Sequence, residues 1–109
     1  MSWIGVDLDA TLAEYHGWKG ANHIGPPIPR MLNRVLDWLN AGKEVRIFTA
    51  RACVPEHIPV IESWCLEHLG RIIPVTNCKD FSMIELWDDR AVQVEPNTGI
   101  RMDGKHEER

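Results

Sequence analysis

Two carboxylates, Asp7 and Asp9, stand one residue apart at the end of a short apolar stretch that begins at Trp3. Alternate side chains of an extended chain share a face, so both can reach one small volume beyond the end of a strand. Two carboxylates at such a place repel each other unless a cation or a proton lies between them. The pair indicates a chemical site, and a solvated acidic turn is the plainer alternative.

A hydroxyl, a lysine and a second carboxylate pair occur further along the chain, at Thr49, Lys79 and Asp88-Asp89. Carboxylate oxygens are ligands that Mg²⁺ prefers. The metal and a lysine can offset the charge of a phosphoryl group, to which a hydroxyl donates one more hydrogen bond. One aspartate can then attack phosphorus, while a second carboxylate protonates the leaving oxygen and later activates water. This set of residues is suited to phosphoryl transfer.

The elements that must position these residues alternate between strands and helices. Apolar and β-prone stretches predict strands over residues 3–7, 44–48, 72–76 and 84–87, with a fifth strand over 91–94. Because Pro74 interrupts the third strand, we expect that strand at an edge of the sheet.

Two helices are expected between the first three strands. The first begins near Pro29, a residue favoured at the first helical position, and ends before Gly42. The second covers residues 55–69 and ends at Gly70. Residues 12–28 lack periodicity and contain three glycines and a Pro-Pro pair, which predicts a loop or a small hairpin.

This alternation predicts one α/β domain over residues 1–101, with a mainly parallel, Rossmann-like sheet of about five strands in three layers. No segment is long enough for a separate cap domain, and the polar residues 102–109 are expected to form a disordered tail. Ligands of such sheets bind at the carboxyl ends of the strands. Asp7 and Asp9, Thr49, Lys79, and Asp88-Asp89 each follow a strand and should meet at that edge.

The same residues, in the same order, resemble the four motifs of the haloacid dehalogenase superfamily of phosphatases. The first motif is Asp7-Leu8-Asp9-Ala10-Thr11, with Ala10 where glycine is frequent in the family. Thr49, Lys79 and Asp88-Asp89 correspond to the other three motifs. The resemblance covers nearly the whole chain and is closest to small members of the superfamily that lack a cap domain.

The resemblance implies a Mg²⁺-dependent phosphomonoester hydrolase that works through an aspartyl-phosphate. Asp7 would be the nucleophile and Asp9 the general acid and base. Thr49 would donate a hydrogen bond to the phosphoryl group, and Lys79 would be the cation beside Asp7, with Arg51 as the alternative cation. The cofactor Mg²⁺ would be bound by the Asp7 carboxylate, the Asp9 backbone carbonyl and Asp89, with Asp88 as a supporting ligand.

Contacts to the substrate are expected from residues near these motifs: Thr11, Ala50, Arg51 and Trp18. Residues 12–28 correspond to a segment that forms a mobile flap in relatives. Its polar and aromatic side chains would touch the leaving group, although a plain surface hairpin is an equal alternative; they are Tyr15, His16, Trp18, Lys19 and His23.

Two alternatives to the phosphatase stay open. A receiver domain that accepts a phosphoryl group also has aspartates, a threonine and a lysine, but there the acidic pair comes first. In this chain an acidic pair follows Lys79, which favours the phosphatase. A non-catalytic module that binds phosphate or metal is the second alternative. A zinc site is a further possibility, since each of the pairs Cys53/His57 and Cys65/His68 has a one-turn helical spacing, although Cys65 also fits the apolar stripe of a helix.

Composition restricts the partners and the location. The chain of 109 residues has a formal net charge of −4, which disfavours a general nucleic-acid surface, so a polynucleotide end is an option but not the favoured substrate. The amino terminus lacks the pattern of a signal peptide, and no apolar run reaches the length of a membrane span. We therefore expect a cytoplasmic monomer or homodimer with reduced cysteines and a phosphorylated substrate.

Overall fold

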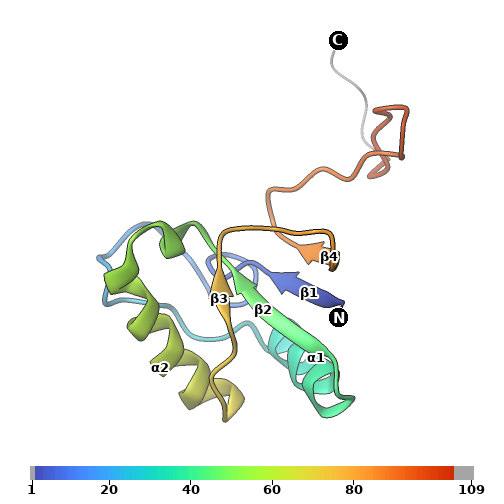
Figure 1. The fold of residues 1–109 in the computed structure, drawn as a ribbon. Coiled ribbons are helices and arrows are strands. Elements are labelled where there is room, and N and C mark those ends of the chain that lie inside the picture. The colour runs from blue at the N-terminus through green and yellow to red at the C-terminus, as the bar shows by residue number, and fades with distance from the viewer. Residues whose placement is uncertain (1, 105–109) are drawn as a thin grey trace.

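The computed structural model describes residues 2–104 and shows an α/β fold around a four-stranded, all-parallel sheet (Figure 1). The strand order is β3-β2-β1-β4. The strands are β1 (Trp3–Val6), β2 (Glu44–Phe48), β3 (Val75–Thr76) and β4 (Met83–Trp87). The prediction of an α/β fold with a parallel sheet is confirmed, and β1 and β2 lie within one residue of the predicted bounds.

Helix α1 (Pro29–Asn40) begins and ends where the sequence predicts. Pro29 fits the first turn because a proline lacks the N–H that would have no partner there. Gly42 adopts a positive φ of 81° just after the helix and allows the chain to turn into β2. Met31, Val35 and Leu39 are buried at four-residue spacing and form the inner stripe of the helix.

The second predicted helix divides into shorter pieces. Two 3-10 helices, η1 (Ala50–Cys53) and η2 (Pro55–His57), precede helix α2 (Ile58–Leu69). Pro59 lies in the first turn of α2. Since a proline ring excludes the α-helical hydrogen bond back to the preceding turn, residues 55–57 stay outside the α-helix. Gly70 closes α2 with a φ of 78°.

The core lies between the sheet and the two helices. Alternate residues of the central strands, Ile4 and Val6 in β1 and Val45 and Ile47 in β2, belong to one buried cluster with the inner stripes of both helices. In α2 that stripe contains Ile61, Trp64, Cys65 and Leu69, so the prediction that Cys65 is a core residue is confirmed. Both helices therefore cover the same face of the sheet.

The connection over residues 77–82 crosses from the β3 edge to the β4 edge without a helix (Figure 1). Trp3, at the start of β1, is fully buried and fixes the end of this connection, because its indole N–H donates to Asp80 Oδ1 at 2.8 Å. The guanidinium of Arg46 covers the Trp3 ring at 4.3 Å from its centroid. The hydrogen bond from Trp3 also lowers the pKa of Asp80. The connection from β3 to β4 is therefore extended, whereas a three-layer fold would have a helix between these strands.

The carboxyl-terminal part differs from the prediction. β3 is shorter than expected because it begins after Pro74, and it lies at the sheet edge as predicted. Within residues 2–104 no fifth strand joins the sheet: Val94 instead makes a single antiparallel bridge with Arg101, in a segment that extends away from the body (Figure 1). The predicted disordered tail begins at residue 102, and its residues 105–109 lie outside the described residues. At its start, the Met102 N–H donates to the Gln93 carbonyl at 2.9 Å.

Neither α-helix in the described part of the chain combines the length and the apolar character that a membrane crossing requires.

Candidate active site

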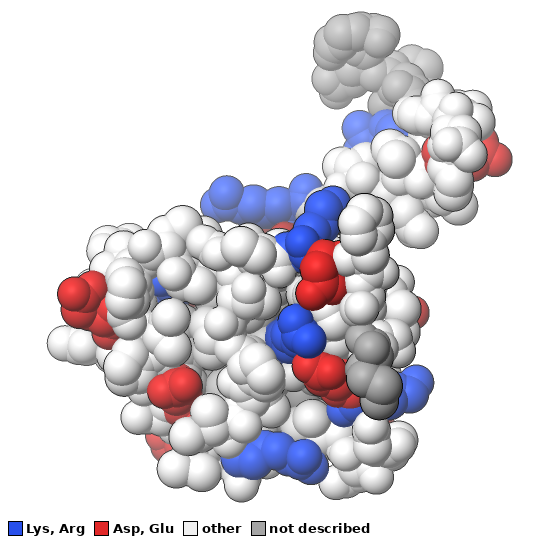
Figure 2. Space-filling view, viewed as in Figure 1, with Lys and Arg blue, Asp and Glu red and all other residues white. Residues whose placement is uncertain are grey.

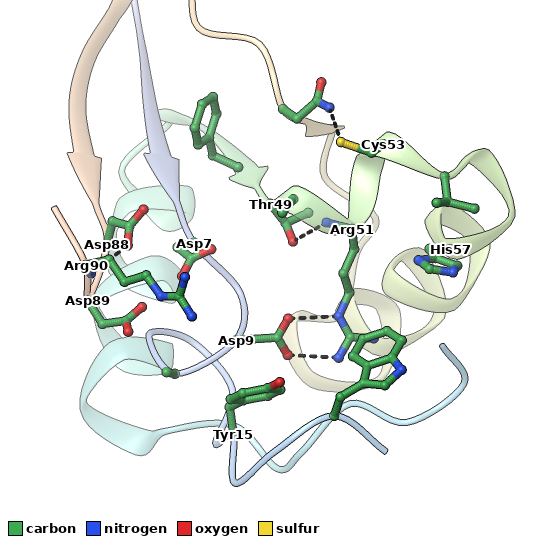
Figure 3. A pocket seen from close by; sticks show the side chains of 16 residues that line it. Asp7, Asp9, Tyr15, Thr49, Arg51, Cys53, His57, Asp88, Asp89 and Arg90 are labelled. Atoms are coloured by element: carbon green, nitrogen blue, oxygen red, sulfur yellow. Dashed lines mark hydrogen bonds and ion pairs between the residues drawn. The ribbon is translucent and has the colours of Figure 1, made fainter. Parts of the chain in front are cut away.

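A cavity of about 720 Å³ lies at the carboxyl ends of the strands and collects most of the predicted site residues (Figure 3). Because the strands are parallel, the residues that follow β1, β2 and β4 reach the same edge of the sheet. The predicted residues that line this cavity are Asp7, Asp9, Trp18, Thr49, Ala50, Arg51, Asp88 and Asp89. The predicted convergence of the two carboxylate pairs and Thr49 is confirmed.

Three aspartates at neighbouring strand ends form an acidic cluster. One ligand oxygen from each of Asp7, Asp88 and Asp89 lies within 4.8 Å of the others. A backbone hydrogen bond of 2.9 Å from the Asp7 N–H to the Trp87 carbonyl fixes the end of β1 beside the end of β4. The β1–β4 pairing therefore brings Asp7 close to Asp88 and Asp89, although about 80 residues of sequence separate Asp7 from that pair.

Burial, together with the neighbouring carboxylates, raises the pKa of Asp7 to about 7. Burial of its side chain is the largest cause, followed by a hydrogen bond with the Asp89 carboxyl group and by the negative charges of Asp88 and Asp89. Without a cation beside it, Asp7 therefore keeps its proton up to near-neutral pH. A group of this kind releases its proton readily when a cation takes the proton's place.

Local hydrogen bonds orient the two carboxylates that follow β4. The Thr11 hydroxyl donates to Asp89 Oδ1 at 3.1 Å and accepts the Asp89 N–H at 3.0 Å. Asp88 Oδ1 accepts the Arg90 N–H at 2.8 Å. Thr11 was predicted to contact substrate, but it is not among the residues that line the cavity. Its hydroxyl instead joins the first motif to the last.

Asp9 is held by a buried arginine. Arg51 donates from Nε to Asp9 Oδ2 at 2.8 Å and from Nη2 to Asp9 Oδ1 at 2.9 Å, a two-bond pair (Figure 3). The Arg51 side chain is only 6% exposed and that of Asp9 is 23% exposed. Arg51 therefore pairs with Asp9, whereas the sequence analysis considered it as a cation for Asp7.

The segment 12–28 is tied to the same arginine. Arg51 donates from Nη2 to the His23 carbonyl at 3.0 Å and from Nη1 to the Ala21 carbonyl at 3.5 Å. Its guanidinium also lies 4.9 Å from the centroid of the Trp18 ring. At the base of the segment, the Glu14 N–H donates to the Pro26 carbonyl at 2.9 Å. The predicted loop is therefore closed at its base by a backbone hydrogen bond, and Arg51 holds it through two of its carbonyl groups.

Thr49 lies at the end of β2 and caps η1. Its side-chain oxygen accepts the Arg51 N–H at 3.2 Å, and its backbone N–H donates to the Thr76 carbonyl at 2.9 Å. Thr49 is only 3% exposed. Since a hydroxyl has one proton to donate besides its two lone pairs, this capping bond leaves the proton free for an anion in the cavity.

Lys79 is an exposed residue of the 77–82 connection, and it is not among the residues that line the cavity. The connection contains no helix that would direct the lysine back toward Asp7. Arg90 lines the cavity instead, and Figure 3 shows its side chain directed toward the space between Asp7 and Asp89. Sequence reasoning missed Arg90, whose only signal was its position directly after the Asp88-Asp89 pair.

The turn after Asp9 holds Ala10 in a backbone conformation that residues other than glycine rarely adopt. Ala10 adopts a positive φ of 72°, a conformation that glycine adopts without strain. Its N–H donates to the Ala13 carbonyl at 2.8 Å, which closes the turn after Asp9.

The proposed cysteine and histidine ligands do not come together. Within residues 2–104, the one set of at least three His, Cys, Asp or Glu side chains that could hold a metal is the acidic cluster. Cys65 is buried in the core, where burial raises the pKa of its thiol to about 11, so this thiol stays protonated. Cys53 and His57 line the cavity, away from any shared ligand set with Cys65.

Comparison of the chain with known protein families, with curated proteins and with solved structures finds no match. The residues of the site and their geometry are therefore the basis on which a function can be proposed.

Proposed function

We propose that the chain is a Mg²⁺-dependent phosphomonoester hydrolase that works through an aspartyl-phosphate on Asp7. The observation that carries the proposal is the convergence of Asp7, Asp88 and Asp89 within 4.8 Å in a cavity that Asp9 and Thr49 also line. The ordered resemblance to the haloacid dehalogenase motifs supports it. The fold is proposed as a reduced form of that superfamily's three-layer, Rossmann-like domain, without a cap.

The acidic cluster fits a hard divalent cation. All three side chains offer oxygen atoms. Burial, together with the two neighbouring carboxylates, raises the pKa of Asp7, and a bound cation would lower it again. Asp7 and Asp89 would be the direct carboxylate ligands, with the Asp9 backbone carbonyl as a third and Asp88 in support. When bound, the cation would offset the negative charge of the phosphoryl group.

The side chains of the cavity can divide the chemical steps among them. An Asp7 oxygen attacks phosphorus, and the bond from phosphorus to the leaving oxygen breaks. Asp9 gives a proton to the leaving oxygen and then takes one from the water that cleaves the aspartyl-phosphate. The Thr49 hydroxyl donates to a phosphoryl oxygen. Because Arg51 donates to both Asp9 oxygens, a proton on Asp9 must sit on one of the lone pairs that these two bonds leave free.

A second candidate function is a non-catalytic module that binds a divalent cation. The pairing of Asp9 with Arg51 favours it, because a carboxylate held at both oxygens by a guanidinium is a poor proton donor. The position of Lys79 outside the cavity lining favours it as well. Both candidate functions use the acidic cluster. They differ in whether Asp9 transfers protons and the protein hydrolyses an ester.

The partners follow from the open cavity. A phosphorylated small molecule or an exposed phosphoryl group can enter without displacing a cap. Figure 2 shows Lys and Arg interspersed with Asp and Glu on the face in view, so this face presents no continuous basic surface for a polynucleotide. We propose a cytoplasmic protein that acts as a monomer or homodimer.

The test is phosphate release from a panel of phosphomonoesters, with Mg²⁺ and with EDTA, by the wild type and by Asp7→Asn. Turnover that needs Mg²⁺ and disappears in Asp7→Asn supports the hydrolase. Calorimetric titration with Mg²⁺ separates the second candidate. Binding of Mg²⁺ by a wild type that releases no phosphate from any ester would favour the non-catalytic module.

A further inference from the structure

The cavity has two ends of opposite chemistry. The acidic end holds Asp7, Asp88 and Asp89, and the proposed function accounts for it. The other end, which we call the aromatic end, contains Trp18 and His57, whose ring centroids lie 6.1 Å apart. In Figure 3, Asp88 and Asp89 lie on one side of the cavity and His57 on the other, with Asp9 and Arg51 between them. The proton transfer proposed above uses no residue of the aromatic end.

Trp18 is held firmly although much of its surface is open. Its ring lies on the guanidinium of Arg51, 4.9 Å from centroid to Cζ, and 6.1 Å from the ring of His57 at an interplanar angle of 37°. Arg51 in turn is buried and fixed by Asp9 and by two carbonyl groups of the 12–28 segment. Nevertheless, 56% of Trp18 is exposed. A large apolar ring is thus presented to the cavity on a rigid base.

The aromatic end is not arranged for the stability of the chain itself. The Nδ1 atom of His57 is buried without a hydrogen-bond partner, which costs free energy. The exposed surface of the Trp18 ring would be more favourably placed in the core than in its present position. Local arrangements that lower stability in this way concentrate at functional sites.

We infer that the aromatic end binds a flat aromatic ring carried by the leaving group of the phosphate ester. An indole face with a cation on its other side stacks well against such a ring, and stacking tolerates many ring types because each presents a π face. The acidic end then receives the phosphoryl group. This inference rests on the proposed function and adds the substrate class. A nucleobase and a benzyl or phenyl group share the required chemistry.

Matched substrate pairs test the inference. Adenosine 5′-monophosphate and ribose 5-phosphate share the reacting ester and differ in the base. Benzyl phosphate and cyclohexylmethyl phosphate differ in the aromaticity of the ring. For at least one pair, kcat/KM of the wild type should favour the aromatic member about tenfold or more, mainly through KM, as base stacking on aromatic side chains suggests. The arm that shows the preference identifies the source of the ring.

Variants assign the preference to Trp18. Trp18→Ala should abolish the ratio of kcat/KM values between the two members of a pair, and Trp18→Phe should keep most of it. The ratio is the readout, because a general loss of activity affects both members equally. Phe81 is a fully exposed aromatic residue on the 77–82 connection, outside the cavity lining, so Phe81→Ala is the matched control and should keep the ratio.

A binding measurement separates failure of this inference from failure of the proposed function. Asp7→Asn, which cannot form the aspartyl-phosphate, is titrated calorimetrically in Mg²⁺ with each member of both pairs. Tighter binding of an aromatic member, lost in Asp7→Asn/Trp18→Ala, supports the aromatic subsite even if no ester is hydrolysed. Equal affinities and equal kcat/KM values within both pairs would overturn the subsite, while turnover of those esters would leave the hydrolase standing.

Discussion

Arg51 donates hydrogen bonds to both carboxylate oxygens of Asp9, with N–O distances of 2.8 and 2.9 Å. The Arg51 side chain is itself only 6% exposed. This pair joins η1 to the first motif, and through the Ala21 and His23 carbonyls it also holds the 12–28 segment. The Arg51–Asp9 ion pair therefore fixes the proposed general acid, and the same arginine holds the 12–28 segment that lines part of the cavity.

We expect Arg51→Ala to lower the free energy of unfolding by about 3 kcal/mol, because removing one partner of a buried pair leaves the other charge uncompensated. Arg51→Lys keeps the charge but loses the two-pronged geometry, so it should recover only part of the loss. Urea unfolding of the three proteins measures both effects. Arg71, an exposed arginine after α2, supplies the control Arg71→Ala, and equal midpoints for Arg51→Ala and Arg71→Ala would contradict the structural role.

The raised pKa of Asp7 makes stability depend on pH in a definite direction. The folded-state pKa of about 7 lies above the usual value of 3.8, so the folded protein binds the proton more tightly than the unfolded chain. The associated stability is fully present below about pH 4 and is lost as the pH rises through about 7. In EDTA, Tm of the wild type should fall over this window relative to Tm of Asp7→Asn.

Addition of Mg²⁺ should raise Tm of the wild type most at the upper end of that window, where the cluster is ionised and binds the cation best. Thermal scans at pH 5 and pH 8, with and without Mg²⁺, check this. The same upward shift in Asp7→Asn at pH 8 would show that the cation binds without Asp7.

Lys79 and Arg90 compete for the role of the cation near the nucleophile. The resemblance implies Lys79, for which removal would cost orders of magnitude in rate. Because Arg90 lines the cavity and Lys79 does not, we expect Arg90→Ala to lower kcat/KM more than tenfold and Lys79→Ala to lower it less than tenfold, by the usual scale of electrostatic stabilisation. Steady-state kinetics on the best ester decides, and a larger loss in Lys79→Ala would return the role to the lysine.

The two carboxylates after β4 should differ in their effect on the cation. Replacing an outer partner of a metal site commonly costs about 10- to 100-fold in affinity, and a direct ligand should cost at least as much. Asp89→Asn should therefore weaken Mg²⁺ binding more than Asp88→Asn, and Thr11→Val, which releases Asp89, should weaken it about tenfold. Calorimetric titration measures each affinity, with Asp37→Asn on the exposed side of α1 as the control.

The base of the 12–28 segment depends on Gly25. A Cβ atom at this buried glycine would lie 2.2 Å from the Glu14 carbonyl oxygen, a backbone atom that cannot move alone. We expect Gly25→Ala to cost about 3 kcal/mol of stability. Gly5 is the comparison, since its Cβ would meet only side-chain atoms at 3.3 Å, and Gly5→Ala should cost about 1 kcal/mol. Similar unfolding midpoints for the two variants would contradict this explanation.

The elements and the convergence of the motifs were predictable because they depend on local patterns. Alternation of β-prone and helical stretches specifies a parallel sheet, and the carboxyl ends of parallel strands share one edge. That geometry alone brings Asp7, Asp9, Thr49, Asp88 and Asp89 to one cavity. The turn at Gly42 and the edge position of β3 were predictable for the same reason, since glycine and proline act on their own backbone.

Contacts between distant side chains were decided only by the tertiary structure. The Arg51–Asp9 pair joins residues 42 positions apart, and the Thr11–Asp89 bond joins residues 78 positions apart. Neither separation leaves a period or a motif in the sequence. The direction of the Arg90 side chain likewise depends on the path of the chain after β4. The sequence by itself determined which groups meet at the sheet edge, and packing determined which of them touch, because side-chain direction depends on neighbours that only the folded chain provides.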